Sequence, residues 1–240
     1  MTDSKRTFTY LVRAAAVAAL VTVAAPAAAQ NYPPVVDNSF RVRLGQFEPR
    51  GDLRYWNDKF TDFTGEIEEF DDISFGGDFV LALSRRHALM FSGDFYEGED
   101  SQAYIDFVDE FGSPIVHETR LAIVSGTAAY VFSPLGRDAA VVPYVGVGGG
   151  VYSWELEESG DFIDFGVFPE EIFTDTFRDT DTALGYFYLA GVEVPVGTSW
   201  SLLVEGRWPY LDQELGGDFE TLGDIDLSGR HIYGGFAWKF

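Results

Sequence analysis

The chain has 240 residues, with 39 acidic residues against 16 lysines and arginines and a formal net charge of −23 at pH 7. Such an acidic chain is a poor partner for nucleic acid, because binding to phosphates requires basic surfaces. The chain contains no cysteine, so no disulfide stabilises it.

Residues 1–29 have the composition of a secretory signal peptide. A basic start is followed by an apolar run over residues 14–25 and by three alanines at 27–29, which form a small-residue cleavage site. The run is too short to cross a bilayer as a helix. We expect residues 30–240 to form one exported all-β domain, which carries 38 of the acids and 13 of the bases. No later apolar run is long enough for a membrane helix, so a membrane location would require a β-barrel.

Eight segments alternate between large apolar residues and small or polar residues with a period of two, which is typical of β-strands. The first places Phe40, Val42 and Leu44 on one face, with Arg41 and Arg43 on the other. A single-chain outer-membrane barrel has an even number of strands. The eight segments are 40–47, 73–83, 89–96, 117–132, 141–154, 182–194, 200–210 and 228–240.

Short and long connections alternate between these segments. Three are short (84–88, 133–140 and 195–199), and four are long (57–72, 97–117, 155–181 and 210–228). The long connections hold 29 of the 38 acids, whereas the short turns carry three arginines and one aspartate. Membrane barrels have tight periplasmic turns and longer outer loops, and a soluble sandwich has no reason to alternate loop length so regularly. The pattern predicts long acidic extracellular loops.

The last segment ends the chain on an aromatic residue. One face of this strand carries the large apolar residues Ile232, Phe236, Trp238 and Phe240. A terminal phenylalanine is unusual in a soluble domain, because chain termini are usually exposed to water. With Gly234, these residues resemble the C-terminal strand of bacterial outer-membrane β-barrels. The resemblance implies that the barrel-assembly machinery recognises this strand during insertion. An edge strand of a soluble sandwich is the alternative.

The glycine-rich run from Pro143 to Gly150 is similar to strands of the small outer-membrane barrels of the OmpA/OmpW type. The resemblance covers most of the mature chain in pattern, but its motifs are generic. It implies an eight-stranded antiparallel transmembrane β-barrel in the outer membrane of a diderm bacterium. Membrane lipid and lipopolysaccharide would surround the barrel, which we expect to be a monomer.

Charged residues on the face opposite the large apolar residues are expected inside the barrel, where eight strands leave room only for side chains. Counting from the turns places Asp78 opposite Asp94 and near Arg41 and Arg43. The same counting places Asp94 opposite Arg120. It also places Arg207 opposite His231. The predicted structural charge network comprises Arg41, Arg43, Asp78, Asp94, Arg120, Glu205, Arg207 and His231.

Two acidic clusters in the predicted loops are weak candidates for divalent cations, which take several oxygen ligands. Neither matches the twelve-residue calcium loop, so no firm metal site is predicted, and no cofactor is expected. The candidates are Glu66, Glu68, Glu69, Asp71 and Asp72 in one cluster, and Glu155, Glu157 and Glu158 in the other.

The histidines do not form a convincing catalytic pair with serine. His87 falls in a predicted periplasmic turn, His117 has Thr119 rather than a serine beside it, and His231 lies three residues from Ser228. We therefore expect a protein without catalytic activity that has a structural or surface-interaction role. A narrow channel for small or apolar solutes is the alternative, and an enzyme that modifies lipid A is the less favoured third possibility.

Overall fold

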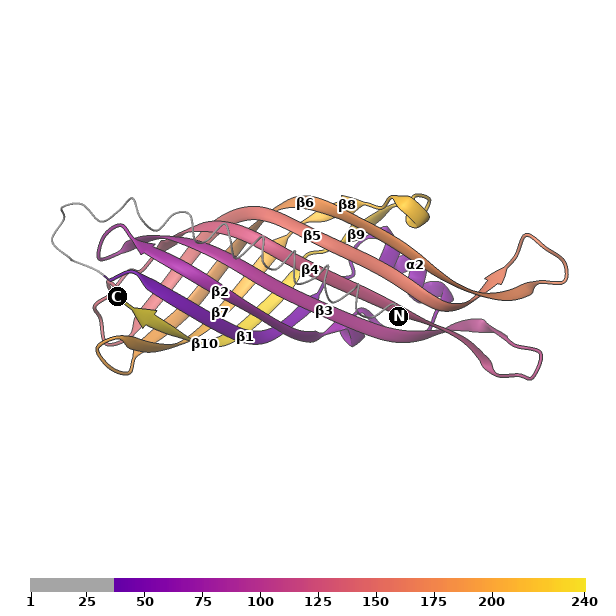
Figure 1. Ribbon diagram of the computed structural model, residues 1–240, viewed down its shortest axis with the longest axis horizontal. Helices are drawn as coiled ribbons and strands as arrows, with labels where there is room; N and C mark the ends of the chain where they lie inside the picture. The colour runs from indigo at the N-terminus through magenta and orange to yellow at the C-terminus, as the bar shows by residue number, and fades with distance from the viewer. Residues whose placement is uncertain (1–36) are drawn as a thin grey trace, which may run out of the picture.

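The computed structural model of the protein describes residues 37–240. The expected signal peptide (1–29) and the first residues of the expected mature domain (30–36) lie outside the described part. Eight long strands form one closed barrel in the order β1-β10-β7-β6-β5-β4-β3-β2, and all neighbours are antiparallel (Figure 1). The predicted eight-stranded antiparallel barrel is therefore confirmed. Its strands are β1 (Ser39–Pro49), β2 (Asp72–Ala82), β3 (His87–Val108), β4 (Pro114–Phe132), β5 (Val142–Asp164), β6 (Glu171–Pro195), β7 (Trp200–Tyr210) and β10 (Gly229–Lys239).

The two ends of the barrel differ. Short turns at 83–86, 133–141 and 196–199 close one end, where the C-terminus also lies (Figure 1). The other end carries all the remaining elements. None of the helices within residues 37–240 is long and apolar enough to cross a bilayer. These elements are α2 (Arg54–Asp62), η1 (Ile67–Phe70), β8 (Asp212–Glu214), η2 (Gly217–Phe219) and β9 (Asp224–Asp226).

Two of the four predicted long loops are mostly strand. The β3–β4 hairpin continues to a turn at 109–113, and β5 pairs with β6 up to Asp164 opposite Glu171. The acids of these segments suggested loops, but a two-stranded ribbon in water can carry charged residues on both faces. The prediction of loops over 97–117 and 155–181 is therefore wrong. The protein instead projects two long hairpins beyond the rest of the barrel (Figure 1).

An apolar band surrounds the barrel near the short turns. Val42, Phe75 and Leu202 point outward and are 53%, 53% and 56% exposed. On β10 the outward residues from Ile232 to Phe240 extend for about 20 Å along the axis, at about 3.3 Å per residue and a tilt of about 40°. This is close to the apolar band of about 25 Å that a membrane barrel presents to lipid.

Above this band the apolar face of the strands turns from the outside to the inside. On β4, Leu121 and Ile123 are buried in the interior, while Arg120 contacts Glu97 and Glu155 on neighbouring strands. The prediction that Arg120 lies in the lumen is wrong. Outside the bilayer the exterior of the wall meets water, so burial of apolar surface favours the interior.

The interior combines apolar and charged groups. A small apolar cluster that includes Met90, Val131 and Leu189 packs beside the charged side chains, with Met90 Sδ 3.7 Å from Arg207 Nη2. A larger apolar core, which includes Phe47, Tyr96 and Trp154, fills the outer end and continues into α2 and the loop that holds β8 and β9.

Candidate functional site

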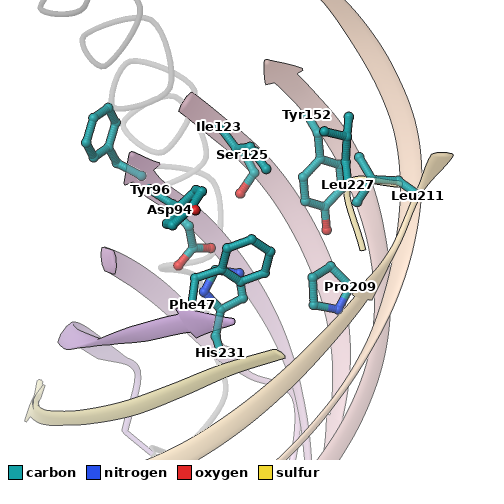
Figure 2. Close-up of a pocket in the computed structure, with 11 residues that line it drawn as sticks. Phe47, Asp94, Tyr96, Ile123, Ser125, Tyr152, Pro209, Leu211, Leu227 and His231 are labelled. Atoms are coloured by element: carbon teal, nitrogen blue, oxygen red, sulfur yellow. The ribbon is translucent and has the colours of Figure 1, made fainter. Parts of the chain in front are cut away.

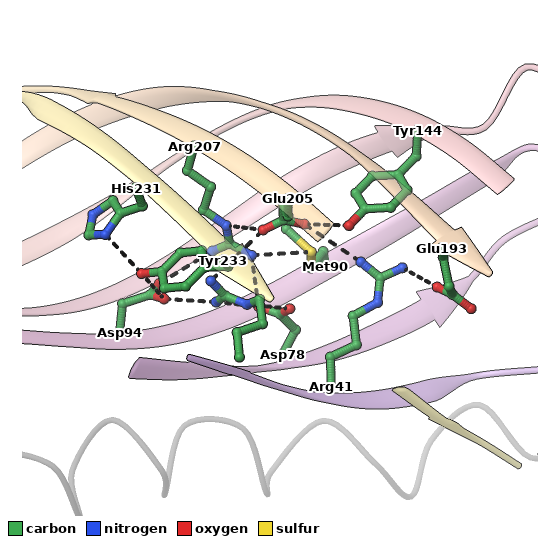
Figure 3. Close-up of polar contacts among 11 residues, drawn as sticks. Arg41, Asp78, Met90, Asp94, Tyr144, Glu193, Glu205, Arg207, His231 and Tyr233 are labelled. Atoms are coloured by element: carbon green, nitrogen blue, oxygen red, sulfur yellow. Dashed lines mark hydrogen bonds and ion pairs between the residues drawn. The ribbon is translucent and has the colours of Figure 1, made fainter. Parts of the chain in front are cut away.

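Two arginines and two aspartates form the centre of the lumen (Figure 3). Arg43 donates from Nε and Nη2 to the two carboxylate oxygens of Asp78 at 2.9 and 2.8 Å, and from Nη2 to Asp94 Oδ1 at 2.8 Å. Arg207 donates to Asp78 Oδ1 at 2.9 Å and to Asp94 Oδ2 at 3.3 Å. Asp78 and Asp94 were expected to be directly opposite one another. They are offset by two residues in register, and the two guanidinium groups compensate their charges.

A second group of ion pairs lies closer to the short turns. Arg41 Nη2 donates to Glu193 Oε2 at 2.9 Å, and Lys239 Nζ lies 2.9 Å from Glu193 Oε1. Tyr144 donates to Glu205 Oε2 at 2.9 Å. Across both groups, three arginines and Lys239 face four carboxylates, so the lumen network is formally neutral. Such balance is needed because an unpaired charge in a low-dielectric interior is costly.

Aromatic rings complete the network. The Arg43 guanidinium lies 4.3 Å from the centre of the Tyr233 ring, and the Arg41 guanidinium lies 4.8 Å from that of Tyr144. These contacts are within the range of cation–π attraction. Tyr144, Tyr233 and Lys239 were not predicted as members of the network. Their inward-facing positions in the alternating pattern could have revealed these three residues. Tyrosine also occurs on the lipid-facing side of membrane barrels, so its identity alone does not indicate the lumen.

His231 lies above this network, in register with Arg207 as expected. Its Nδ1 is 2.9 Å from the hydroxyl of Tyr233 and 3.2 Å from Ser74 Oγ. Its ring stacks on Phe47 with 4.3 Å between ring centres. Ser228, the serine nearest in sequence, instead exchanges hydrogen bonds with the backbone of Leu211.

Two small cavities lie between the network and the outer apolar core. Each has a volume of about 20 Å³, which is room for about one water molecule. Asp94, Ser125, Tyr152 and His231 line both of them. Figure 2 shows one of the two cavities. Each of these two cavities is therefore too small for a lipid chain.

A short helix closes the outer end of the barrel. Tyr55 and Trp56 of α2 are buried in the outer core, and Trp56 Nε1 donates to the backbone oxygen of Asp226 at 3.1 Å. On the same helix, Lys59 is 5% exposed and reaches the barrel wall. We call this helix the lid.

Lys59 binds to two residues of the wall. Its Nζ donates to Glu158 Oε1 of β5 at 2.6 Å and lies 3.2 Å from His117 Nε2 of β4. Tyr55 also donates to Glu158 Oε1, at 2.6 Å. Because the ammonium group can only donate, His117 Nε2 is an acceptor and the ring is neutral, with its proton on Nδ1. The four side chains Tyr55, Lys59, His117 and Glu158 form what we call the lid latch.

Burial shifts the protonation of the lid latch. It lowers the pKa of His117 to about 4, and the Lys59 ammonium acts in the same direction. Burial also lowers the pKa of Lys59, although Glu158 opposes the shift. Burial alone would raise the pKa of Glu158, but the charge of Lys59 and the hydrogen bonds from Lys59 and Tyr55 hold that pKa below its usual value.

Lys59 was not identified from the sequence, because residues 57–72 were assigned to an acidic loop. The spacing of Tyr55, Trp56, Lys59 and Phe60 would place one face of a helix against the barrel. That pattern was the signal that could have revealed the lid.

The second acidic cluster is not a loop. All three residues of this cluster lie within β5, and each contacts the basic side chain of another residue. They are Glu155, Glu157 and Glu158. Arg120 Nη2 donates to Glu155 Oε1 at 2.8 Å, Arg178 donates to Glu157, and Glu158 belongs to the lid latch. The expectation of a cation site at this cluster is replaced by protein ion pairs.

The first acidic cluster lies in and around η1. Glu66 and Glu69 form a capping box at the start of this helix, which directs their carboxylates to backbone N–H groups. Burial and the neighbouring Glu48 raise the pKa of Asp71. Over residues 37–240, no group of three or more acids, histidines or cysteines is placed to hold a metal ion. The cluster also includes Glu68 and Asp72.

The residues of the expected assembly signal lie on the outer face of β10. Ile232, Phe236, Trp238 and Phe240 are each 44–50% exposed, and a Cβ added at Gly234 would meet open space. Phe240 stacks on Phe40 of β1 with 5.3 Å between ring centres. The terminal residue thus lies at the seam where β10 pairs with β1 and closes the barrel.

The fold is similar to those of solved outer-membrane proteins. OprG from Pseudomonas aeruginosa is 12% identical, with 85% of this chain and 95% of that chain covered and a TM-score of 0.56. Neisserial surface protein A is 13% identical, with coverage of 85% and 96% and a TM-score of 0.45. Ail of Yersinia pestis is 11% identical, with coverage of 85% and 97% and a TM-score of 0.43.

At these identities the similarity concerns the fold. No protein-family model matches the sequence, and no curated protein is detectably similar to it. The closed eight-stranded barrel, its outward apolar band and the match to OprG define the class: the chain has the fold of the small outer-membrane β-barrels.

Proposed function

We propose that the protein is a closed barrel in the outer membrane of a diderm bacterium, with no catalytic activity and a surface-interaction role. This proposal is based on the observation that side chains fill the lumen. Ion pairs occupy its centre, the outer apolar core lies above them, and the lid is bound over that core. A barrel filled in this way passes little current, so its functional surface is the part that projects outward.

The remaining interactions follow from this location. The apolar band would contact membrane lipid, and the wall above it would contact lipopolysaccharide. The C-terminal strand would be recognised by the barrel-assembly machinery, and the barrel would be a monomer. The acidic surface would repel the phosphates of nucleic acid.

The test is the conductance of the purified, refolded protein in planar lipid bilayers. We expect no steady current from the native protein. A large ohmic conductance from the native protein would contradict the proposal and favour the narrow channel. An unchanged lipid A mass spectrum on overexpression would support the absence of lipid-modifying activity, and a changed one would contradict it.

A further inference from the structure

The two projecting hairpins separate from each other at one point. β4 and β5 pair continuously from the short turns up to His117 opposite Gly160, and their pairing ends there. Gly160 has a φ of +145°, and a Cβ at this position would lie 2.6 Å from His117 Cα. Glycine therefore permits the close approach at which the wall divides. Beyond it, the edges of β4 at 114–116 and of β5 at 161–164 face one another without pairing (Figure 1).

A groove lies between the two hairpin tips. Its volume is about 830 Å³, at the upper end of the range for ligand sites. Its floor is held in place by contacts between the hairpins. The rings of Phe107 and Phe165 lie 5.2 Å apart, and the backbone N–H of Ile163 donates to the hydroxyl of Tyr104 at 3.3 Å.

The groove is lined by apolar side chains that water reaches freely. Phe168 is 95% exposed and Phe111 is 83% exposed, on opposite hairpins. Burying a side chain of this size contributes about 1.5–3 kcal/mol. Large exposed apolar patches rimmed by polar residues are typical of interaction sites. Both tips lie well beyond the apolar band, so membrane lipid does not cover them.

The charge around the groove has one sign. Residues 97–119 and 155–177, which form both tips, contain no lysine or arginine. Carboxylates line the groove at Asp109, Glu110, Asp161, Glu170 and Glu171. An anionic partner such as lipid A phosphate would be repelled, whereas a cationic partner would be attracted.

We propose that this groove binds an extended, cationic and amphipathic polypeptide segment. Phe111 and Phe168 bind its apolar side chains, and the carboxylates bind its lysines or arginines. This proposal rests on the surface-interaction role proposed above and names the partner class.

The test uses the full-length protein refolded in detergent and a fluorescently labelled ten-residue peptide that alternates lysine and phenylalanine. We expect saturable binding that weakens as salt is raised, because exposed charge pairs are screened. A peptide with glutamate in place of lysine should not bind. Equal binding of the two peptides, or no binding of the lysine peptide, would overturn the proposal.

Variants locate the site. Phe168→Ser should weaken binding about tenfold, and so should the pair Glu170→Gln and Glu171→Gln. The matched control is Glu214→Gln with Glu220→Gln, which removes two exposed charges from another loop and should change binding less than twofold. Equal losses in the control and groove pairs would refute the groove. Migration of unboiled protein on gels verifies that each variant is folded.

The result is separable from the conductance test. A barrel that carries no current and binds no peptide would refute only the groove, whereas a conducting barrel would refute only the closed lumen. Self-association that Phe168→Ser abolishes would assign the groove to a second copy of the chain and overturn the peptide proposal.

Discussion

The lid latch offers a direct test of what closes the outer end of the barrel. Lys59→Met keeps most of the side-chain volume but leaves the Glu158 carboxylate without its cation. Breaking a buried ion pair in this way typically costs about 3–5 kcal/mol. Glu158 retains the hydrogen bond from Tyr55 and can take up a proton, so we expect the lower end, about 3 kcal/mol. At about 1.4 kcal/mol per factor of ten, opening of the lid becomes roughly 100-fold more frequent.

Amide hydrogen exchange at pH 7 measures this opening. Exchange of the α2 amides (Arg54–Asp62) should accelerate roughly 100-fold in Lys59→Met, while the membrane strands β7 and β10 keep their protection. Adding Glu158→Gln should recover at least half of the loss, because the stranded charge is removed.

The matched control lies on the same helix. Arg54 pairs with Asp58, but their side chains are 66% and 62% exposed, and exposed pairs contribute about 0.3–0.5 kcal/mol. Arg54→Met should therefore change exchange by about twofold. Equal effects of Lys59→Met and Arg54→Met would refute the reasoning that the buried pair closes the lid.

Three further predictions concern the seam, the lumen and pH. Phe240→Ser should reduce the amount of folded barrel in outer-membrane fractions, because it removes the stacking on Phe40 at the closing seam; unchanged assembly would contradict this. Arg43→Leu should lower the unfolding free energy in urea by about 3 kcal/mol or more. Arg230→Leu should cost about 1 kcal/mol or less, because the side chain of Arg230, which pairs with Glu48, is 50% exposed; the reverse order would contradict the assignment of Arg43 to the lumen. Acidification from about pH 6.5 to about pH 4 should loosen the lid in hydrogen exchange, because in this window the unfolded chain protonates His117 while the folded chain keeps it neutral. Glu158 adds to the loss below this window, since its pKa is lowered in the fold and its stabilising charge disappears as pH falls through that pKa. A lid whose exchange, corrected for the intrinsic rate, does not change over this range would contradict the latch.

The barrel itself was predictable because the membrane imposes a strict rule on it. Within the bilayer every strand must place apolar residues toward lipid and small or polar residues toward the lumen, so a period of two is directly visible in the sequence. The eight strands, the short turns and the outward face of β10 follow from that pattern. So does the inward position of Arg41, Arg43, Asp78 and Asp94.

The pairing of charges and everything above the membrane depended on the tertiary structure. The sequence placed Arg120 beside Asp94, but closure of the barrel brings Arg207 to Asp94 from a strand more than 100 residues away. Above the bilayer the same alternation has the opposite meaning, because water lies outside the wall and the apolar side chains turn inward. The lid latch joins residues about 100 positions apart in the chain, and only the folded barrel brings Lys59 to Glu158. The local alternation of the sequence determines which residues share a face of a strand. The surrounding solvent and the closure of the sheet determine whether that face contacts lipid, water or the side chains of distant strands.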